Sequence, residues 1–243
     1  MAGHHFVGFV GSIGKVWAVT LGSLTAATAL YGAGAVLLRP WMRTWGSTAR
    51  ERAVALPGDG LVSDANQQTH AVTVSGAAAA VWPWLVQIGQ GRAGFYSHDR
   101  LERLVGARIT NAEEIHPEWQ QLAVGDLVRT YRPWPRFEPL GWFVAEIDPE
   151  RTLVLHEPAR RGVINSSWSL TLGEKGGETR VLSRWRFRRR RGRLLFAALV
   201  FDPMHFVMET GMLRGLKRRA ERAARGPAAT KAMATPTPDE IRQ

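Results

Sequence analysis

One dense group of polar and aromatic side chains in this sequence has the residue types needed for chemistry. Arg92 comes shortly before Tyr96, His98 and Asp99, and His116 follows in a separate segment. A carboxylate beside a histidine can act in general acid/base catalysis, which accelerates reactions by about 10²- to 10⁴-fold when geometry and pKa suit the reaction. The competing interpretation is structural, with Asp99 in the first turn of a helix, Tyr96 packed and Arg92 paired with a carboxylate. If the chain is an enzyme, the catalytic candidates are Tyr96, His98, Asp99 and His116.

A second possible site lies towards the C-terminus, where His205 and Glu209 are four residues apart and Asp202 comes one turn earlier. This spacing permits a metal site. However, Asp202 before Pro203 is explained as a helix N-cap, and no HExxH pattern is present. We therefore predict no metal and no cofactor. His70 faces inward on a predicted strand, and we interpret it as a hydrogen-bonded core histidine.

The most basic segment of the chain runs from Arg184 to Arg193. On a strand, Trp185 and Phe187 would face the core, and the arginines that alternate with them, including Arg184, would face solvent. Attraction to anionic headgroups is worth on the order of 1 kcal/mol per basic residue near a membrane. A solvated face is the alternative, and nucleic acid is the least favoured partner. The predicted membrane contacts are Arg188, Arg189, Arg190, Arg191 and Arg193.

These residues need a scaffold of helices and antiparallel strands. Residues 77–88 have apolar positions at helical spacing, and Ser97 can begin a short second helix that runs to Leu104. A long final helix is predicted from Asp202 to about Ala224, with methionines that pack on the sheet or line an apolar site. Runs typical of strands, separated by turn residues, cover 69–74, 126–132, 141–147, 152–157, 163–172 and 179–188.

The N-terminal part is predicted to cross a membrane once, over residues 16–39. No charge lies between Lys15 and Arg39, and such a helix is long enough for a hydrocarbon core of about 30 Å. A cleavable signal peptide is the alternative, but the apolar run is longer than such peptides use. More basic residues follow the span than precede it, so we expect a single-pass protein of the cell membrane with a cytoplasmic C-terminal domain.

The remaining boundaries follow from composition. Residues 1–15 form an N-terminal segment, 40–67 an extended and exposed linker, 68–224 one folded domain and 225–243 a disordered tail. Lys and Arg outnumber Asp and Glu by 32 to 21, a net charge of +11 that favours polyanionic partners. The absence of cysteine excludes disulfides, thiolate nucleophiles and thiolate metal sites.

The order of strand, two helices, antiparallel strands and long final helix resembles the helix-grip, or START-like, fold of the SRPBCC superfamily, which includes polyketide cyclase and lipid-transfer domains. The segments VWPWLVQIGQGRAGFYSHDRLE, IHPEWQQLAVGD and DPMHFVMETGMLRGLKRRAE resemble an uncharacterised bacterial subgroup with an N-terminal hydrophobic segment, roughly over residues 69–224. The resemblance implies an α+β fold in which a curved antiparallel sheet wraps around the long C-terminal helix and leaves an apolar cavity, here preceded by one transmembrane helix.

The resemblance also implies a location for the site, because the first group of residues would lie at the cavity mouth. We expect a membrane-anchored module that binds a hydrophobic small molecule or lipid and does not bind nucleic acid. One alternative is an enzyme of the cyclase or dehydratase type, and another is a non-catalytic protein with a basic, lipid-contacting surface. The expected ligand-binding residues are Arg92, Tyr96, His98, His116, Trp119, Met204, Met208 and Met212.

Overall fold

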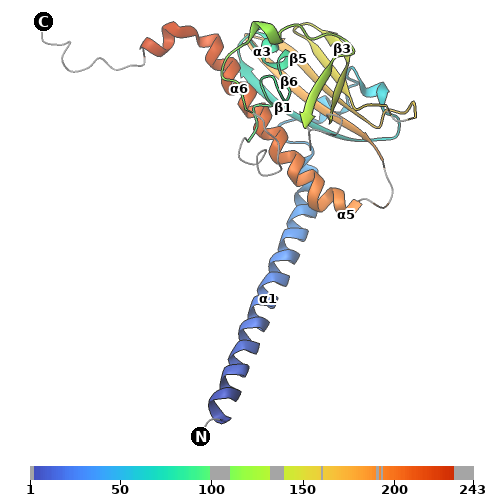
Figure 1. The fold of residues 1–243 in the computed structure, drawn as a ribbon. Coiled ribbons are helices and arrows are strands. Elements are labelled where there is room, and N and C mark those ends of the chain that lie inside the picture. Colours follow the sequence, from blue (N-terminus) through green and yellow to red (C-terminus); the bar gives the residue numbers. More distant parts are fainter. Residues whose placement is uncertain are drawn as a thin grey trace, which may run out of the picture.

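The structure is a computed structural model that describes residues 3–98, 110–131, 140–159, 161–189, 192 and 194–232. Its centre is an antiparallel sheet of six strands (Figure 1) in the order β1-β6-β5-β4-β3-β2. The strands are β1 (Ala65–Ser75), β2 (Leu127–Tyr131), β3 (Leu140–Asp148), β4 (Thr152–His156), β5 (Ser166–Lys175) and β6 (Glu178–Arg188). The predicted strands and their antiparallel pairing are confirmed within these residues.

The hairpin between β5 and β6 determines which side chains of β6 face the core. Gly176 and Gly177 both have positive φ, 62° and 78°, as a two-residue turn between twisted strands requires. The turn places Lys175 opposite Glu178 and pairs β6 with β5 along its whole length. A one-residue slip would reverse both faces of the strand, so this turn decides the direction of every side chain in β6.

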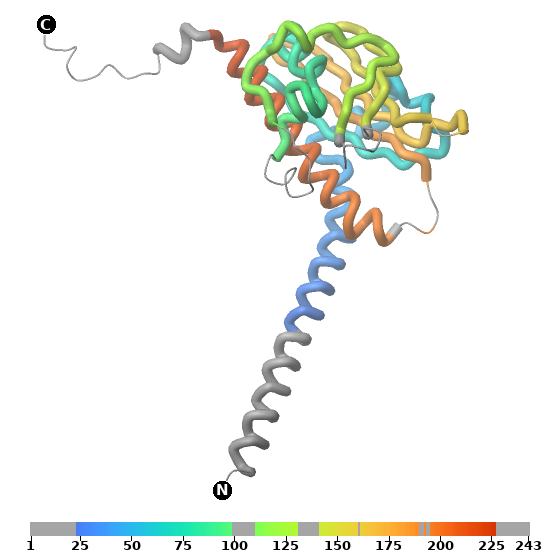
Figure 2. The backbone as a smooth tube through the Cα atoms, viewed as in Figure 1, coloured from blue at the N-terminus to red at the C-terminus, as the bar shows by residue number. Residues whose placement is uncertain are grey.

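The core lies between the sheet and two helices, α3 (Ala78–Val86) and α6 (Asp202–Ala232). α6 runs across one face of the sheet, and α3 packs against α6 and against the sheet (Figures 1 and 2). The fully buried apolar side chains that join these elements are Val81, Leu85, Leu153, Leu155, Leu170, Val181, Leu213 and Leu216. A long C-terminal helix held against a curved antiparallel sheet is the predicted helix-grip arrangement, so this part of the fold prediction is confirmed.

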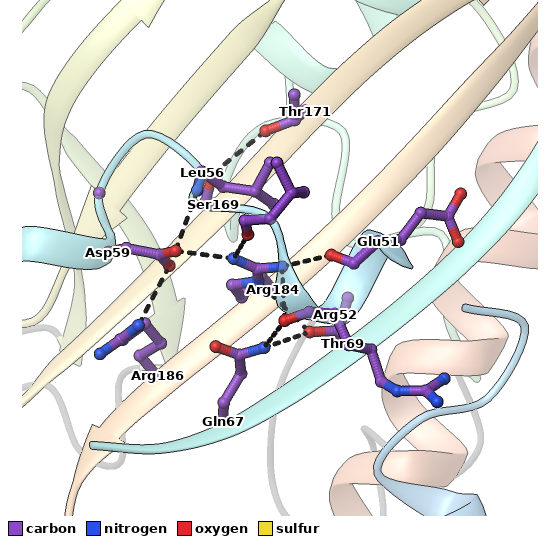
Figure 3. A network of polar contacts seen from close by, with 12 residues as sticks. Glu51, Arg52, Leu56, Asp59, Gln67, Thr69, Ser169, Thr171, Arg184 and Arg186 are labelled. Carbon is purple, nitrogen blue, oxygen red and sulfur yellow. Dashed lines mark hydrogen bonds and ion pairs between the residues drawn. The ribbon is translucent and has the colours of Figure 1, made fainter. Parts of the chain in front are cut away.

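Residues 43–62 form an arm that hydrogen-bonds the free edge of β1 through the Arg43 and Trp45 carbonyls and then crosses the outer face of the sheet, opposite α6. Figure 3 shows Glu51 and Asp59 of the arm around Arg184. The arm contains α2 (Ala49–Ala53) and a short 3₁₀ helix, η1 (Asp59–Leu61). Thr48 and Glu51 cap α2 reciprocally, the side chain of each bonding the backbone N–H of the other. The side chain of Arg180 also hydrogen-bonds Glu51, and this lowers the pKa of the carboxyl to about 2.

Arg184 joins the arm to the sheet and is only 2% exposed. Its guanidinium donates to Asp59 Oδ2 at 2.7 Å, to the Val54 carbonyl at 2.8 Å and to the Glu51 carbonyl at 2.6 Å. The expectation of an extended, exposed linker over residues 40–67 is therefore wrong, as is the solvent-facing position of Arg184. The strand pattern identifies the outer face, but it does not show that another part of the chain covers that face.

One long helix, α1 (Gly3–Met42), projects from the domain and meets it beside the start of α6 (Figures 1 and 2). It includes Pro40 and the range predicted to cross a membrane, and it ends two residues after the proline. In the part of the chain that the structure describes, no helix has the length and apolarity to cross a membrane. Large apolar side chains of α1 are exposed nevertheless, including Leu24, Leu30 and Leu37.

A helical corner connects β6 to the core-facing part of α6. It consists of α5 (Leu194–Phe196) and a π-helical turn, η3 (Ala197–Phe201), which continues directly into α6. Asp202 has helical dihedral angles and is buried, so the predicted N-cap role of Asp202 is wrong. Pro203 has no N–H to bond the Leu199 carbonyl four residues earlier, and the Tyr31 hydroxyl of α1 donates to that carbonyl instead.

The end of the chain differs from the predicted disordered tail over residues 225–243. α6 changes direction at Gly226, where φ is 62°, and helical structure continues to Ala232. Pro227 and the alanines after it favour a new first turn, which explains the helix. Residues 233–243 lie outside the described part of the chain.

Candidate functional site

A pocket of about 700 Å³ opens where the end of the sheet meets α5 and η3. Pockets of this size accommodate small organic molecules. We call it the α5 pocket. Its lining residues that carry rings or charges are Trp185, Phe187, Phe196, Phe201, Arg39, Arg188, Arg189 and Glu157.

The apolar wall of the α5 pocket is built by β6 and by the helical corner. Alternation along β6 turns Trp185 and Phe187 towards α6. Both rings contact Phe201, with centroid distances of 5.3 Å and 5.7 Å. The ring of Phe196 is 58% exposed, so one side of the wall is open to the surroundings.

The cationic groups of the α5 pocket differ in how far the fold already uses them. Arg39 Nε donates to Asp202 Oδ2 at 2.6 Å, which leaves this arginine occupied. Arg189 Nε lies 3.6 Å from Asp64 Oδ1, but both side chains are exposed and such a pair contributes little. Arg188 is exposed at the end of β6. Arg188 and Arg189 are therefore available to an anionic group.

A buried polar cluster, the Glu209 cluster, lies directly behind the pocket. Trp168 Nε1 donates to Ser183 Oγ at 2.8 Å, and Ser183 Oγ donates to Glu209 Oε1. His205 Nε2 lies 3.8 Å from Glu209 Oε2, and its ring packs on Trp185 with a centroid distance of 4.2 Å. Trp185 thus separates this cluster from the α5 pocket.

Burial favours the uncharged forms of the ionisable side chains in the cluster. It raises the pKa of Glu209 to about 7 and lowers the pKa of His205 well below its usual value, with nearby His70 as a further cause for His205. His205 Nδ1 has no hydrogen-bond partner among the described atoms. His70 is 1% exposed with Nε2 2.6 Å from the Met42 carbonyl, which confirms it as a hydrogen-bonded core histidine.

The Glu209 cluster lacks the arrangement of an activated nucleophile. Ser183 donates to the carboxylate of Glu209 and has no bond to an imidazole, whereas a catalytic serine needs a base within hydrogen-bond reach. In the described part of the chain, no group of three or more His, Asp or Glu side chains could hold a metal ion. The geometry here suits a buried polar support for the wall of the pocket better than a reacting centre.

Two of the residues expected from sequence, Tyr96 and Arg92, are used by the fold. The Tyr96 hydroxyl donates to the Trp84 carbonyl at 2.8 Å and accepts from Gln87 Nε2 at 3.1 Å, and burial raises its pKa. Arg92 Nη2 donates to the carbonyls of Val86, at 3.0 Å, and of Trp119. Arg92 thereby connects the end of α3 to the 3₁₀ helix η2 (Pro117–Trp119).

The remaining catalytic candidates lie at the surface of the domain or outside the residues that the structure describes. His98 is exposed and lies against Gly211 of α6, where an added Cβ would come within 2.8 Å of its ring. His116 stacks on Trp119 with a centroid distance of 4.1 Å and lies 3.3 Å from Glu118. Asp99 lies outside the described residues, as does most of the predicted helix from Ser97 to Leu104. A role of these residues in binding or catalysis stays a prediction.

The methionines of α6 lie in three different environments. Met212 is buried in the core, whereas the Met208 carbonyl accepts a hydrogen bond from Ser97 Oγ at 2.9 Å. Met204 is 55% exposed, and its expected role in ligand binding stays a prediction. The α5 pocket is lined by none of the eight residues expected to bind ligand. Arg188 and Arg189 do line it, while Arg190, Arg191 and Arg193 lie outside the described residues.

Sequence reasoning missed the aromatic wall of the α5 pocket. The signal was present in β6, where Trp185 and Phe187 alternate with arginines directly before the apolar run from Leu194 to Phe201. Each feature has a separate local explanation, because β6 alternates as an amphipathic strand and the run after it is apolar. Their convergence depends on the corner formed by α5 and η3, which brings Phe201 onto β6.

Comparison by sequence found no matching family model and no matching curated protein. Among solved structures, protein MLL2253 from Mesorhizobium loti is 17% identical with a TM-score of 0.37, and the match covers 64% of this chain and 98% of that one. The Aha1 dimer from Colwellia psychrerythraea is 11% identical with a TM-score of 0.38, and the match covers 64% of this chain and 96% of that one. The polyketide-cyclase-like protein Cgl2372 from Corynebacterium glutamicum is 14% identical with a TM-score of 0.30, and the match covers 70% of this chain and 94% of that one.

These matches are likenesses in fold between chains of low sequence identity. Independently of them, the strand order β1-β6-β5-β4-β3-β2 and the packing of α6 on the sheet are features of this chain itself. The membrane-anchored subgroup stays a prediction. The described chain has the helix-grip architecture that its resemblance to the SRPBCC superfamily implied.

Proposed function

We propose that the protein binds an amphiphilic lipid in the α5 pocket while α1 holds it in a membrane. The observation that carries the proposal is the composition of this pocket, in which four aromatic side chains adjoin Arg188 and Arg189. Aromatic and aliphatic contacts suit an acyl or polyisoprenoid chain, and guanidinium groups suit an anionic headgroup. The ligand class is therefore a lipid with an apolar tail and a phosphate or carboxylate at its head.

The composition and position of α1 support membrane attachment. Residues 16–38 carry no charge, and the helix projects away from the sheet (Figure 1). Leu24 is 62% exposed and Leu37 is 78% exposed, and large apolar groups in water are unfavourable unless something covers them. A bilayer would cover these side chains. The arginines after the span favour a cytoplasmic position for the domain.

Binding without catalysis is the better interpretation of the site. The buried pair of His205 and Glu209 lies behind the ring of Trp185. The hydroxyl of Tyr96, a buried catalytic candidate, is occupied by hydrogen bonds of the fold. General acid/base catalysis requires a group within hydrogen-bond reach of the reacting atom.

Titration of the detergent-solubilised full-length protein with a soluble short-chain phosphatidylglycerol tests this proposal. We expect saturable binding that Phe196→Ala weakens by roughly tenfold, because one ring of the wall is lost. Replacing both Arg188 and Arg189 by Gln should reduce the preference for phosphatidylglycerol over phosphatidylcholine. Calorimetry measures both affinities.

Trp119→Ala is the matched control, because Trp119 is an aromatic residue of the site expected from sequence and does not line the α5 pocket. Its affinity for the lipid should equal that of the unmodified protein. If Trp119→Ala abolishes binding and Phe196→Ala has no effect, the ligand lies at the other end of α6 and the assignment to the α5 pocket is wrong.

A further inference from the structure

The helical corner formed by α5 and η3 lies beside the part of α1 that is assigned to the membrane. The Tyr31 hydroxyl donates to the Leu199 carbonyl, and a Cβ added at Gly32 would lie 3.8 Å from Leu199 Cδ2. Nearer the domain, the ring of Trp41 lies 4.8 Å from that of Phe206, and Arg39 pairs with Asp202. Between Tyr31 and Trp41, α1 therefore contacts η3 and the first turns of α6.

This contact determines a depth for the corner once α1 spans a bilayer. Arg39 is the first charge after the apolar span, and its guanidinium belongs near the headgroups. Tyr31 precedes it by eight residues, which corresponds to about 12 Å along a helix axis, and to less in depth if the helix is tilted. Leu199, bonded to Tyr31, must then lie below the level of Arg39, within the hydrocarbon of the same leaflet.

The composition of the corner suits this position. Residues 194–201 read LLFAALVF, without any charged or polar side chain. Leu195 is 71% exposed and Val200 is 47% exposed, so the apolar groups of this segment are not covered by the domain. The segment is helical, and the hydroxyl of Tyr31 donates to the Leu199 carbonyl, which Pro203 cannot bond. Backbone satisfaction is a requirement for any segment that enters hydrocarbon.

Charge complementarity identifies the occupant of this surface. The exposed Arg188 and Arg189 lie in the chain just before the apolar corner and line the same pocket as Phe196 and Phe201. Basic residues beside an exposed apolar segment are typical of a contact with anionic lipid. The basic residues bind headgroups, and the apolar side chains enter the acyl chains.

From the Tyr31–Leu199 contact and the exposed apolar corner, we infer that residues 194–201 enter the leaflet of an anionic bilayer as a second membrane element, so that the α5 pocket opens into the lipid and is loaded from the side. This inference rests on the proposed anchoring by α1 and on lipid binding in the pocket. It adds a route for the ligand, which reaches the aromatic wall without passing through water.

Depth measurements on the full-length protein in vesicles of phosphatidylcholine and phosphatidylglycerol test the inference. The chain contains no cysteine, so single substitutions can be labelled uniquely with a nitroxide. The test positions are Leu195→Cys and Val200→Cys, and the references are Leu24→Cys on α1 and Lys175→Cys at the exposed β5–β6 turn. Collisions of each nitroxide with oxygen, which dissolves in lipid, are compared with collisions with a water-soluble nickel complex.

We expect labels at positions 195 and 200 to favour oxygen, as at position 24, and a label at position 175 to favour nickel. If the label at position 24 favours oxygen while the labels at positions 195 and 200 favour nickel, α1 is in the membrane but the corner is not, and the inference is wrong. If position 24 also favours nickel, the proposed anchoring fails and the inference fails with it. If 195 and 200 exclude both reagents, protein covers the corner, and the inference is wrong because a partner such as a second copy of the chain is the occupant.

A loading experiment tests the route separately from the depth. The double substitution Leu195→Asp and Val200→Asp changes exposed side chains that do not line the pocket. It should slow the uptake of lipid from vesicles by roughly tenfold or more, because charges oppose insertion. Affinity for the soluble short-chain lipid in detergent should stay unchanged, which shows that the fold and the pocket are intact. Equal uptake rates from vesicles would contradict lateral loading.

Discussion

Glu209 and His205 are separated by one helical turn, and burial changes their acid–base behaviour in opposite directions. The pKa of the carboxyl rises to about 7, and that of the imidazole falls well below its usual value. Desolvation is the main cause for both, because it disfavours whichever form is charged. Burial therefore favours the neutral form of each side chain behind the wall of the α5 pocket.

Glu209→Gln is expected to remove one pH dependence of stability. A raised pKa means that the folded chain binds the proton more tightly than the unfolded chain does. The contribution of Glu209 to the free energy of unfolding is therefore fully present below about pH 4.5, and it is lost as the pH rises through about 7. The shift corresponds to on the order of 3 kcal/mol. Urea unfolding of both proteins at about pH 5 and about pH 8 measures it.

The stability of the unmodified chain relative to Glu209→Gln should fall between these two pH values. The opposite contribution of His205 is present in both proteins and largely cancels. Glu178→Gln, an exposed carboxylate at the start of β6, is the matched control and should show a constant difference. A constant difference for Glu209→Gln as well would show that its carboxyl titrates normally.

Among the larger elements, the arm of residues 43–62 is held by arginines of β6, of which Arg184 is buried. Arg184 donates to carbonyl groups and to Asp59 in the arm (Figure 3). Arg180 pairs with Glu51. These bonds reach across more than a hundred residues of sequence. Arg184 also stands opposite Thr69 of β1 and Ser169 of β5, in the middle of the sheet. The arm therefore covers central strands as well as the edge strand β1.

Arg184→Met is expected to release the arm and to destabilise the domain by about 3–5 kcal/mol, because the substitution leaves Asp59 and several carbonyls without their buried donor. Hydrogen exchange of the amides between residues 47 and 62 should become faster than that of the amides of β4. Arg218→Met, at an exposed position of α6, provides the control. Unchanged exchange in the arm would mean that apolar contacts alone hold it.

In the molecule as a whole, α1, the helical corner and the α5 pocket lie at one end of the sheet, which supports the proposed contact with a membrane. The opposite end of the sheet carries the β5–β6 turn, far along the strands from Arg188. A membrane at the α1 end would leave that turn in water. The basic end of β6 and the exposed apolar groups of α5 would face the same leaflet.

The predicted orientation of the whole molecule can be tested with reporters fused to the C-terminus. Arg39, Arg43, Arg50 and Arg52 follow the span, so we expect a reporter that is active in the cytoplasm to work and one that requires export to be inactive. Activity measurements on both fusions in intact cells distinguish the two orientations. Activity of the exported reporter alone would place the domain on the outside and reverse the topology.

Local patterns by themselves determined much of this protein. The alternation in β6 determined that Trp185 and Phe187 share a face, and the 3-4 spacing of apolar residues determined α3 and the buried stripe of α6. These patterns are readable because each depends only on neighbours within a turn or a strand. The resemblance to the SRPBCC superfamily supplied the order in which the elements pack.

Only the tertiary structure decided what lies against each face. Arg184 has the pattern of a solvent-facing residue, yet the arm buries it, and Asp202 has the sequence of an N-cap, yet it pairs with Arg39 from α1. The α5 pocket likewise needs β6, the helical corner and α1 together. The physical reason is that periodicity gives a side chain its direction, whereas its burial, partner and pKa depend on segments that folding brings from far along the chain.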